Sequence, residues 1–147
     1  MPVLAINGGE KVRTKLFPKY NNIDEKEIND VVEVLKTGVL SKYLGAWHDD
    51  FYGGQQVQEF EKQWSEYFDV KHSISVNSNT SGIITALGAC GVGLGDEVLV
   101  SSYSMSISAS APLFWNATPV FCDLDDETHS FCIDSIKKNI TEHTKAI

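Results

Sequence analysis

The sequence has few cysteines, few basic residues and no long apolar run, and each shortage excludes a class of protein. Its three cysteines are an odd number and none are spaced C-x-x-C, which argues against a disulfide framework or a zinc ribbon and favours a reducing cytoplasm. Lys and Arg number 12 against 20 Asp and Glu, a formal charge of −8, so neither nucleic acid nor an anionic membrane is an expected partner. No apolar stretch approaches the roughly 18 residues of a membrane span, and the first residues do not predict a signal peptide.

Two segments have the composition of ligand-binding motifs without their spacing. Residues 88–95 (GACGVGLG) fit neither the dinucleotide fingerprint nor the Walker loop, because Asp and Leu stand where a glycine and a lysine are required. They predict a helix end followed by a turn. Residues 123–129 (DLDDETH) are rich in oxygen ligands but lack the glycine and glutamate of an EF-hand, so they predict a solvated turn and no metal site.

Apolar periodicity predicts an α/β organisation. A helix capped by Asp24, with Glu27 completing a capping box, is expected to run to Gly38, and a second helix to cover 55–69. From residue 72 onward, β-type runs alternate with helix-length segments, as in parallel βαβ units. We expect strands at 72–77, 97–101 and 118–122, and helices at 80–91, 105–115 and 133–140.

Three local features qualify this pattern. Pro112 should kink or shorten the helix at 105–115, because proline removes a helical hydrogen bond. Residues 144–147 look like the start of a fourth strand, so we expect the chain to be truncated within a sheet. Residues 39–54 form an aromatic, glycine-rich loop in which Trp47, Phe51 and Tyr52 line a substrate pocket, make a subunit contact, or pack locally.

The most informative segment is 76–83 (VNSNTSGI), where a strand is expected to end and a helix to begin. The free N–H groups and positive dipole end of that helix form an anion site suited to phosphate, and the hydroxyls of Thr80 and Ser81 are placed to add hydrogen bonds. Such turns lie beyond the carboxyl ends of strands, where α/β sheets bind ligands. An ordinary N-cap is the alternative, because Ser, Asn and Thr are preferred there.

Several short segments share one order and spacing with a known family. They are 4–9 (LAINGG), 53–61 (GGQQVQEFE), 77–82 (NSNTSG), 93–98 (GLGDEV), 102–105 (SYSM), 117–121 (ATPVF), 123–125 (DLD), 140–141 (IT) and 144–147 (TKAI). No single piece is specific, but the ordered set resembles the DegT/DnrJ/EryC1/StrS family of pyridoxal-phosphate (PLP) aminotransferases.

This resemblance implies an α/β protein of the PLP-dependent transferase fold type I, with a mostly parallel sheet. The chain would be the N-terminal part of the large domain, left incomplete. Residues 1–54 would form an arm, a helix and the aromatic loop. Residues 55–147 would form the first part of the PLP-binding domain, truncated before the catalytic lysine.

The resemblance also assigns site residues. It implies that Asn79, Thr80 and Ser81 hold the PLP phosphate and that Met105 packs against the PLP ring. Asn79 replaces the family's commoner glycine, which its tolerance of left-handed backbone angles allows. Met105 replaces an aromatic residue, and a thioether can also pack on a ring. No catalytic residue is expected in this span, because the family's lysine and its acidic partner lie further along the chain. The 147 residues alone are therefore predicted to be inactive.

In function, the resemblance implies transfer of an amino group from glutamate or glutamine to a keto sugar, nucleotide-linked, for polysaccharide or secondary-metabolite biosynthesis. A cytoplasmic homodimer is implied as well. Three alternatives stay open: a PLP-dependent sugar dehydratase with histidine in place of the lysine; a non-catalytic relative that binds PLP or a partner; and an unrelated βαβ nucleotide-binding enzyme, whose glycine fingerprint is missing.

Overall fold

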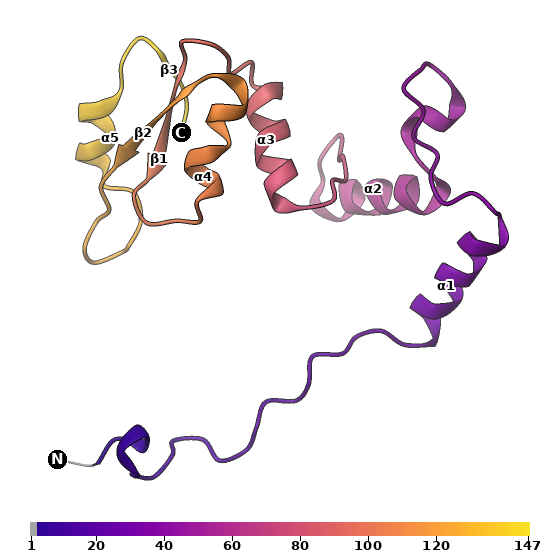
Figure 1. Cartoon of the computed structure of the whole chain (residues 1–147), viewed down its shortest axis with the longest axis horizontal. Helices are drawn as coiled ribbons and strands as arrows, with labels where there is room; N and C mark the ends of the chain where they lie inside the picture. The colour runs from indigo at the N-terminus through magenta and orange to yellow at the C-terminus, as the bar shows by residue number, and fades with distance from the viewer. Residues whose placement is uncertain (1–2) are drawn as a thin grey trace. The chain divides into compact units, whose positions relative to one another are not determined.

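The structure, a computed structural model, describes residues 3–147, which fall into two compact units. Unit 1 ends at Phe60 and unit 2 comprises Glu61–Ile147. Unit 1 holds η1 (Ala5–Asn7), α1 (Glu25–Lys36) and η2 (Asp49–Tyr52), and α2 (Gln55–Phe68) runs from it into unit 2 (Figure 1). Among the described residues, no helix is long and apolar enough to cross a membrane.

Helix α1 begins and ends where its sequence signals predict. The Oδ1 atom of Asp24 accepts a hydrogen bond from the Lys26 N–H at 2.8 Å, and the Asp24 N–H donates to Glu27 Oε2 at 2.9 Å. This reciprocal arrangement is the predicted capping box. Gly38 follows the helix with φ of 71°, a left-handed angle that favours glycine and turns the chain out of the helix.

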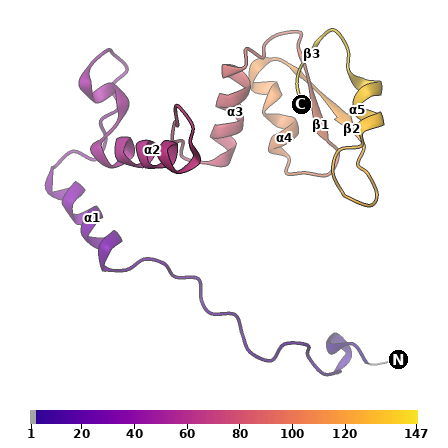
Figure 2. The same ribbon diagram turned by 180° about the vertical axis from the view of Figure 1, so that it is seen from behind.

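Unit 2 is built around a three-stranded parallel sheet in the order β2–β1–β3. Its strands are β1 (Glu97–Ser101), β2 (Thr118–Cys122) and β3 (Thr144–Ala146), with Leu99 opposite Val120. These elements confirm the predicted strands at 97–101 and 118–122 and the start of a strand at 144. Figures 1 and 2 show α3 (Asn79–Ala89) and α4 (Ile107–Ser110) on one side of the sheet and α5 (Ile133–Asn139) on the other.

The core of unit 2 sits on the central strand. Val98 and Val100 point to one face and pack with Val92 and Ala117, while Leu99 points to the other face and is only 1% exposed. A central parallel strand is covered on both faces, which explains why β1 reads as a continuous apolar run rather than an alternating one.

Pro112 shortens the helix predicted at 105–115, as expected, and the strand predicted at 72–77 needs correction. The helix predicted at 105–115 is α4 followed by a separate 3₁₀ turn, η3 (Pro112–Trp115), because Pro112 interrupts the helical hydrogen bonds as its chemistry requires. The strand predicted at 72–77 is wrong: residues 72–76 have no regular structure. A strand needs a neighbouring ladder, and here the N–H and the hydroxyl of Ser75 both donate to Glu61 Oε1, at 2.7 and 2.8 Å.

Candidate functional site

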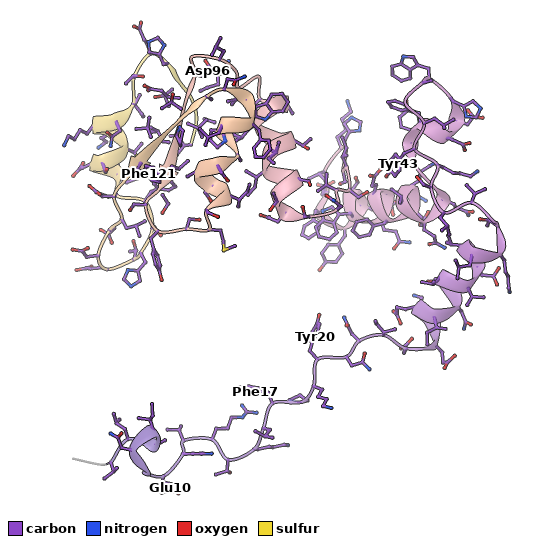
Figure 3. The ribbon with its side chains drawn as sticks, in the orientation of Figure 1. Glu10, Phe17, Tyr20, Tyr43, Asp96 and Phe121 are labelled. Carbon is purple, nitrogen blue, oxygen red and sulfur yellow. The ribbon has the colours of Figure 1, made fainter. Side chains whose placement is uncertain are left out.

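The carboxyl ends of the strands in unit 2 form one edge, and several polar loops meet there. Strand β1 runs away from Asp96, which lies at the opposite end of the sheet (Figure 3). Residues 102–106 follow β1 and lead into α4, and residues 123–132 follow β2. Helix α3 begins at this same edge in both views (Figures 1 and 2). The edge is the place where open α/β sheets bind ligands.

The start of α3 carries a well-formed cap. The Oγ atom of Ser78 accepts the Ser81 N–H at 3.1 Å, and the first helical hydrogen bond runs from the Gly82 N–H to the Ser78 carbonyl at 3.0 Å. Across residues 3–147, no acceptor is within bonding geometry of the Asn79 or Thr80 N–H. Both residues are exposed. These two N–H groups, at the positive end of the helix dipole, are the donors that an anion would meet.

The hydroxyl of Ser81 is already engaged by a neighbour. It donates to Asn77 Oδ1 at 2.6 Å and lies 3.1 Å from the Ser78 hydroxyl. A hydroxyl has one proton, so in this arrangement Ser81 has none left for an anion. The sequence pattern placed Thr80 and Ser81 together as hydroxyl donors to an anion. It did not predict that Asn77 Oδ1 accepts the Ser81 proton, which leaves Thr80 as the candidate hydroxyl donor.

Met105 lies in the loop between β1 and α4. Its side chain is 77% exposed, and its carbonyl accepts the Ser108 N–H at 3.0 Å. The loop is held by short-range contacts: the Tyr103 N–H donates to Ser101 Oγ at 3.2 Å. The start of α3 and this loop therefore share the carboxyl edge, and Met105 is available there to contact a ligand.

A close packing contact fixes α3 against η3. The Trp115 indole N–H donates to the Ile84 carbonyl at 2.8 Å. The indole also lies so near Gly88 that a Cβ atom there would come 2.2 Å from Trp115 Cζ2. The turn η3 directly follows α4, and α4 follows the loop that carries Met105. The Trp115 contact therefore connects α3 with the segment that contains this loop.

The two segments with motif-like composition adopt the predicted turns. Helix α3 ends at Ala89, and Gly91 then takes a left-handed φ of 75°, which confirms the predicted helix end. In the acidic segment, Asp125 Oδ1 accepts the Thr128 N–H at 2.8 Å and its hydroxyl at 2.9 Å. These hydrogen bonds lower the pKa of Asp125, the backbone bond most. Within residues 3–147, no group of three or more His, Cys, Asp or Glu is placed to hold a metal ion.

Unit 1 contains a loop that the sequence did not reveal as a closed structure. Residues 42–53 begin and end together, because the Gly53 N–H donates to the Lys42 carbonyl at 3.0 Å. Inside the loop, the Leu44 N–H donates to the Asp50 carbonyl at 3.1 Å, and Trp47 stacks on Phe51 with centroids 5.0 Å apart. Trp47 is nonetheless 85% exposed, so the stack forms part of the surface.

Comparison with known proteins places these features in a family. The sequence model of the DegT/DnrJ/EryC1/StrS aminotransferase family matches residues 21–147. The L-glutamine:2-deoxy-scyllo-inosose aminotransferase of Streptomyces lividus is 37% identical over 98% of this chain and 33% of its own length. The spore coat polysaccharide biosynthesis protein SpsC of Bacillus subtilis is 37% identical over 85% of this chain and 29% of its own length.

Solved structures agree on the fold. The PLP form of Spr1654 from Streptococcus pneumoniae superimposes with a TM-score of 0.72 at 30% identity, covering 84% of this chain and 29% of that one. The chain thus spans about a third of the length of the curated relatives it matches. Its parallel sheet and flanking helices are consistent with part of a fold type I domain, as predicted. Together with the match over residues 21–147, this shows that the chain belongs to the DegT/DnrJ/EryC1/StrS aminotransferase family.

Proposed function

We propose that this chain forms the cofactor-phosphate-binding part of a PLP-dependent aminotransferase that acts on a keto sugar, with glutamate or glutamine as the amino donor. The observation that carries the proposal is the start of α3, where the N–H groups of the exposed residues Asn79 and Thr80 lie at the carboxyl edge of a parallel sheet. The relatives support the reaction: one is named as an aminotransferase of 2-deoxy-scyllo-inosose, with L-glutamine in its name.

The residues at this edge fit a phosphorylated ring. The two N–H groups and the Thr80 hydroxyl would hold the phosphate, since a helix N-terminus favours a dianion over a neutral group. The exposed Met105 side chain would lie against the ring, because a thioether packs well on aromatic surfaces. When bound, PLP supplies an electron sink for the substrate carbon. The chain's own part is to bind and orient the cofactor.

A backbone substitution at Asn79 tests the phosphate site directly. Asn79 is the first helical residue after the cap, where proline is tolerated, and Ser78 has the extended backbone that a following proline requires (φ −163°, ψ 160°). Asn79→Pro therefore deletes one anion-facing N–H and leaves the helix in place. Asn79→Ala is the matched control, because it changes the side chain and keeps that N–H.

The ligand for this test is pyridoxamine phosphate, whose amine does not condense with surface lysines. In fluorescence titrations of the whole chain, Asn79→Pro should weaken binding about tenfold, as expected for losing one charge-assisted hydrogen bond, and Asn79→Ala should change it little. Pyridoxamine without phosphate should bind weakly to every variant. Equal binding of the two ligands by the unsubstituted chain would refute a phosphate site at this helix.

The chain spans about a third of the length of its curated relatives, and the family resemblance places the cofactor-binding lysine outside the matched span. We propose that the coding sequence past codon 147 specifies the lysine that binds the cofactor covalently, and reading that sequence tests the statement. A histidine in the corresponding turn would favour a sugar dehydratase. A stop codon there would leave a non-catalytic PLP-binding relative.

Four finer points are proposals on the same basis. We propose a nucleotide-linked form of the keto sugar, used in polysaccharide or secondary-metabolite biosynthesis, and a cytoplasmic homodimer. Steady-state assays that compare nucleotide-linked with free keto sugars test the first, and sedimentation equilibrium tests the dimer.

A further inference from the structure

A polar hollow lies in unit 1 beside the closed loop 42–53. Its volume is about 470 Å³, within the roughly 300–1,000 Å³ range of small-molecule sites. The loop and the first turn of α2 line it with an ammonium group, two carboxylates, two amides and a phenol. These lining residues are Lys42, Asp49, Asp50, Tyr52, Gly53, Gln55 and Gln58. None belongs to the proposed phosphate site.

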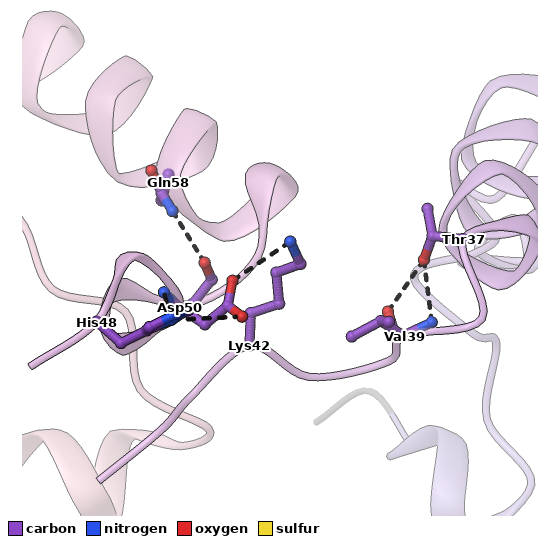
Figure 4. A network of polar contacts seen from close by, with 7 residues as sticks. Thr37, Val39, Lys42, His48, Asp50 and Gln58 are labelled. Carbon is purple, nitrogen blue, oxygen red and sulfur yellow. Dashed lines mark hydrogen bonds and ion pairs between the residues drawn. The ribbon is translucent and has the colours of Figure 1, made fainter. Parts of the chain in front are cut away.

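Several of these groups are held in place by contacts within unit 1. Lys42 Nζ lies 3.3 Å from Asp50 Oδ1, and the Gln58 side-chain amide donates to the Gly53 carbonyl at 2.9 Å (Figure 4). The Asp50 N–H donates to His48 Nδ1 at 3.1 Å, which fixes the backbone that carries the carboxylate. These contacts limit the side-chain freedom of Lys42, Asp50 and Gln58, three of the groups that line the hollow.

The mixture of groups selects a class of ligand. Carboxylates only accept hydrogen bonds, the ammonium only donates, and the amides do both. Each hydroxyl is both a donor and an acceptor, so a ring that carries several hydroxyls can bond to the carboxylates, the ammonium and the amides at the same time. Tyr52, with 60% of its surface exposed, adds a flat apolar face on which the C–H side of such a ring can rest.

The charge of the hollow argues against an anionic ligand. Its single ammonium, on Lys42, is already paired with Asp50, and Asp49 adds a second negative charge. The chain as a whole carries a formal charge of −8. A diphosphate placed here would meet more negative than positive charge, and its attraction to Lys42 would compete with a preformed ion pair.

We propose that this hollow binds an uncharged polyhydroxylated ring, a sugar or cyclitol, and does not bind a nucleoside diphosphate. The choice of ring rests on the proposed function, because the same ring would be the amino acceptor. For a nucleotide-linked substrate, the hollow takes the ring and leaves the nucleotide to another surface.

The test uses the whole chain without PLP and two probes observed by saturation-transfer NMR: scyllo-inosose, a neutral ring, and uridine diphosphate. We expect millimolar binding of scyllo-inosose and no binding of uridine diphosphate. Asp49→Asn and Lys42→Gln should each weaken scyllo-inosose binding about three- to tenfold, because each variant loses the charge and keeps only a weaker, neutral hydrogen bond. Asp126→Asn, the same change at an exposed carboxylate of unit 2, is the matched control and should leave binding unchanged.

If the unsubstituted chain binds uridine diphosphate and Lys42→Gln does not, the charge argument is wrong. Scyllo-inosose binding that is absent, or equal in Asp49→Asn and Asp126→Asn, would overturn the assignment of the hollow. Circular dichroism melts of each variant separate loss of binding from loss of folding. The NMR measurement needs no cofactor, so the two proposals can fail separately. Loss of scyllo-inosose binding with normal pyridoxamine phosphate binding refutes only this proposal, and the opposite result refutes only the phosphate site.

Discussion

Replacing Gly88 by alanine is expected to destabilise unit 2, although alanine is the better helix former. Gly88 lies inside α3, and an ideal Cβ built there is 2.2 Å from Trp115 Cζ2. Non-bonded carbons pack at about 3.5–4.0 Å, so the indole must move by more than an ångström. That displacement breaks the 2.8 Å hydrogen bond from Trp115 to the Ile84 carbonyl.

The contributions to the free energy of unfolding have opposite signs. Alanine gains about 0.5–1 kcal/mol over glycine in a helix interior. Forcing an extra carbon into a packed contact costs about 1–3 kcal/mol, and a lost hydrogen bond about 0.5–1.5 kcal/mol. The steric and hydrogen-bond losses exceed the gain, so we expect a net destabilisation of about 1–3 kcal/mol.

Urea unfolding followed by circular dichroism measures this difference, and Gly82→Ala is its control in the same helix. At Gly82 the added Cβ lies 3.5 Å from Val76 Cγ2, an ordinary contact, so that variant should gain about 0.5–1 kcal/mol. In a Trp115→Leu background, Gly88→Ala should destabilise the protein much less than it does in the unsubstituted chain, because the indole that it clashes with is absent. If Gly88→Ala stabilises the protein as Gly82→Ala does, the steric reasoning fails.

The remaining predictions concern the sheet and the acidic turn. Leu99 is 1% exposed, so Leu99→Ala leaves a cavity in the core and should lower the free energy of unfolding in urea by about 2–5 kcal/mol. Ser135→Ala removes the buried hydroxyl that accepts the Asp123 N–H at 2.9 Å and should cost about 1–2 kcal/mol by the same assay. The lowered pKa of Asp125 favours its charged form in the folded state, so its contribution to stability is complete at neutral pH and disappears as the pH falls below about 4. Asp125→Asn should flatten that acid limb in pH-dependent melts, and an unchanged limb would contradict the assignment.

Signals that act within a few residues predicted the structure well. The capping box of α1 needs only Asp24 and Glu27, three positions apart, and both hydrogen bonds form. Pro112 interrupts a helix through its own ring. The strand run at 97–101 is apolar because β1 is covered on both faces, whereas the edge strand β2 at 118–122 is recognised by its β-type residues although Phe121 is 57% exposed.

Features that depend on distant partners were missed. The apolar alternation of residues 72–77 favours an extended chain but does not supply a ladder, and Glu61 takes the hydrogen bonds of Ser75 instead. The composition of residues 77–81 indicated an anion site, yet which hydroxyl is free depends on the rotamer of Asn77. The pairing of Lys42 with Asp50 requires the chain to fold back on itself, and no periodic pattern reports such a return.

The closed loop of unit 1 also has an evolutionary consequence. Its ends meet through the backbone bond between Gly53 and Lys42, so the segment enters and leaves at nearly one point. Loop-closure entropy grows only slowly with length, and insertions at such a point disturb the flanking helices little. Residues 43–52 can therefore lengthen, shorten or be exchanged while α1 and α2 keep their own hydrogen bonds, which makes this loop a place where related proteins can diversify what they recognise.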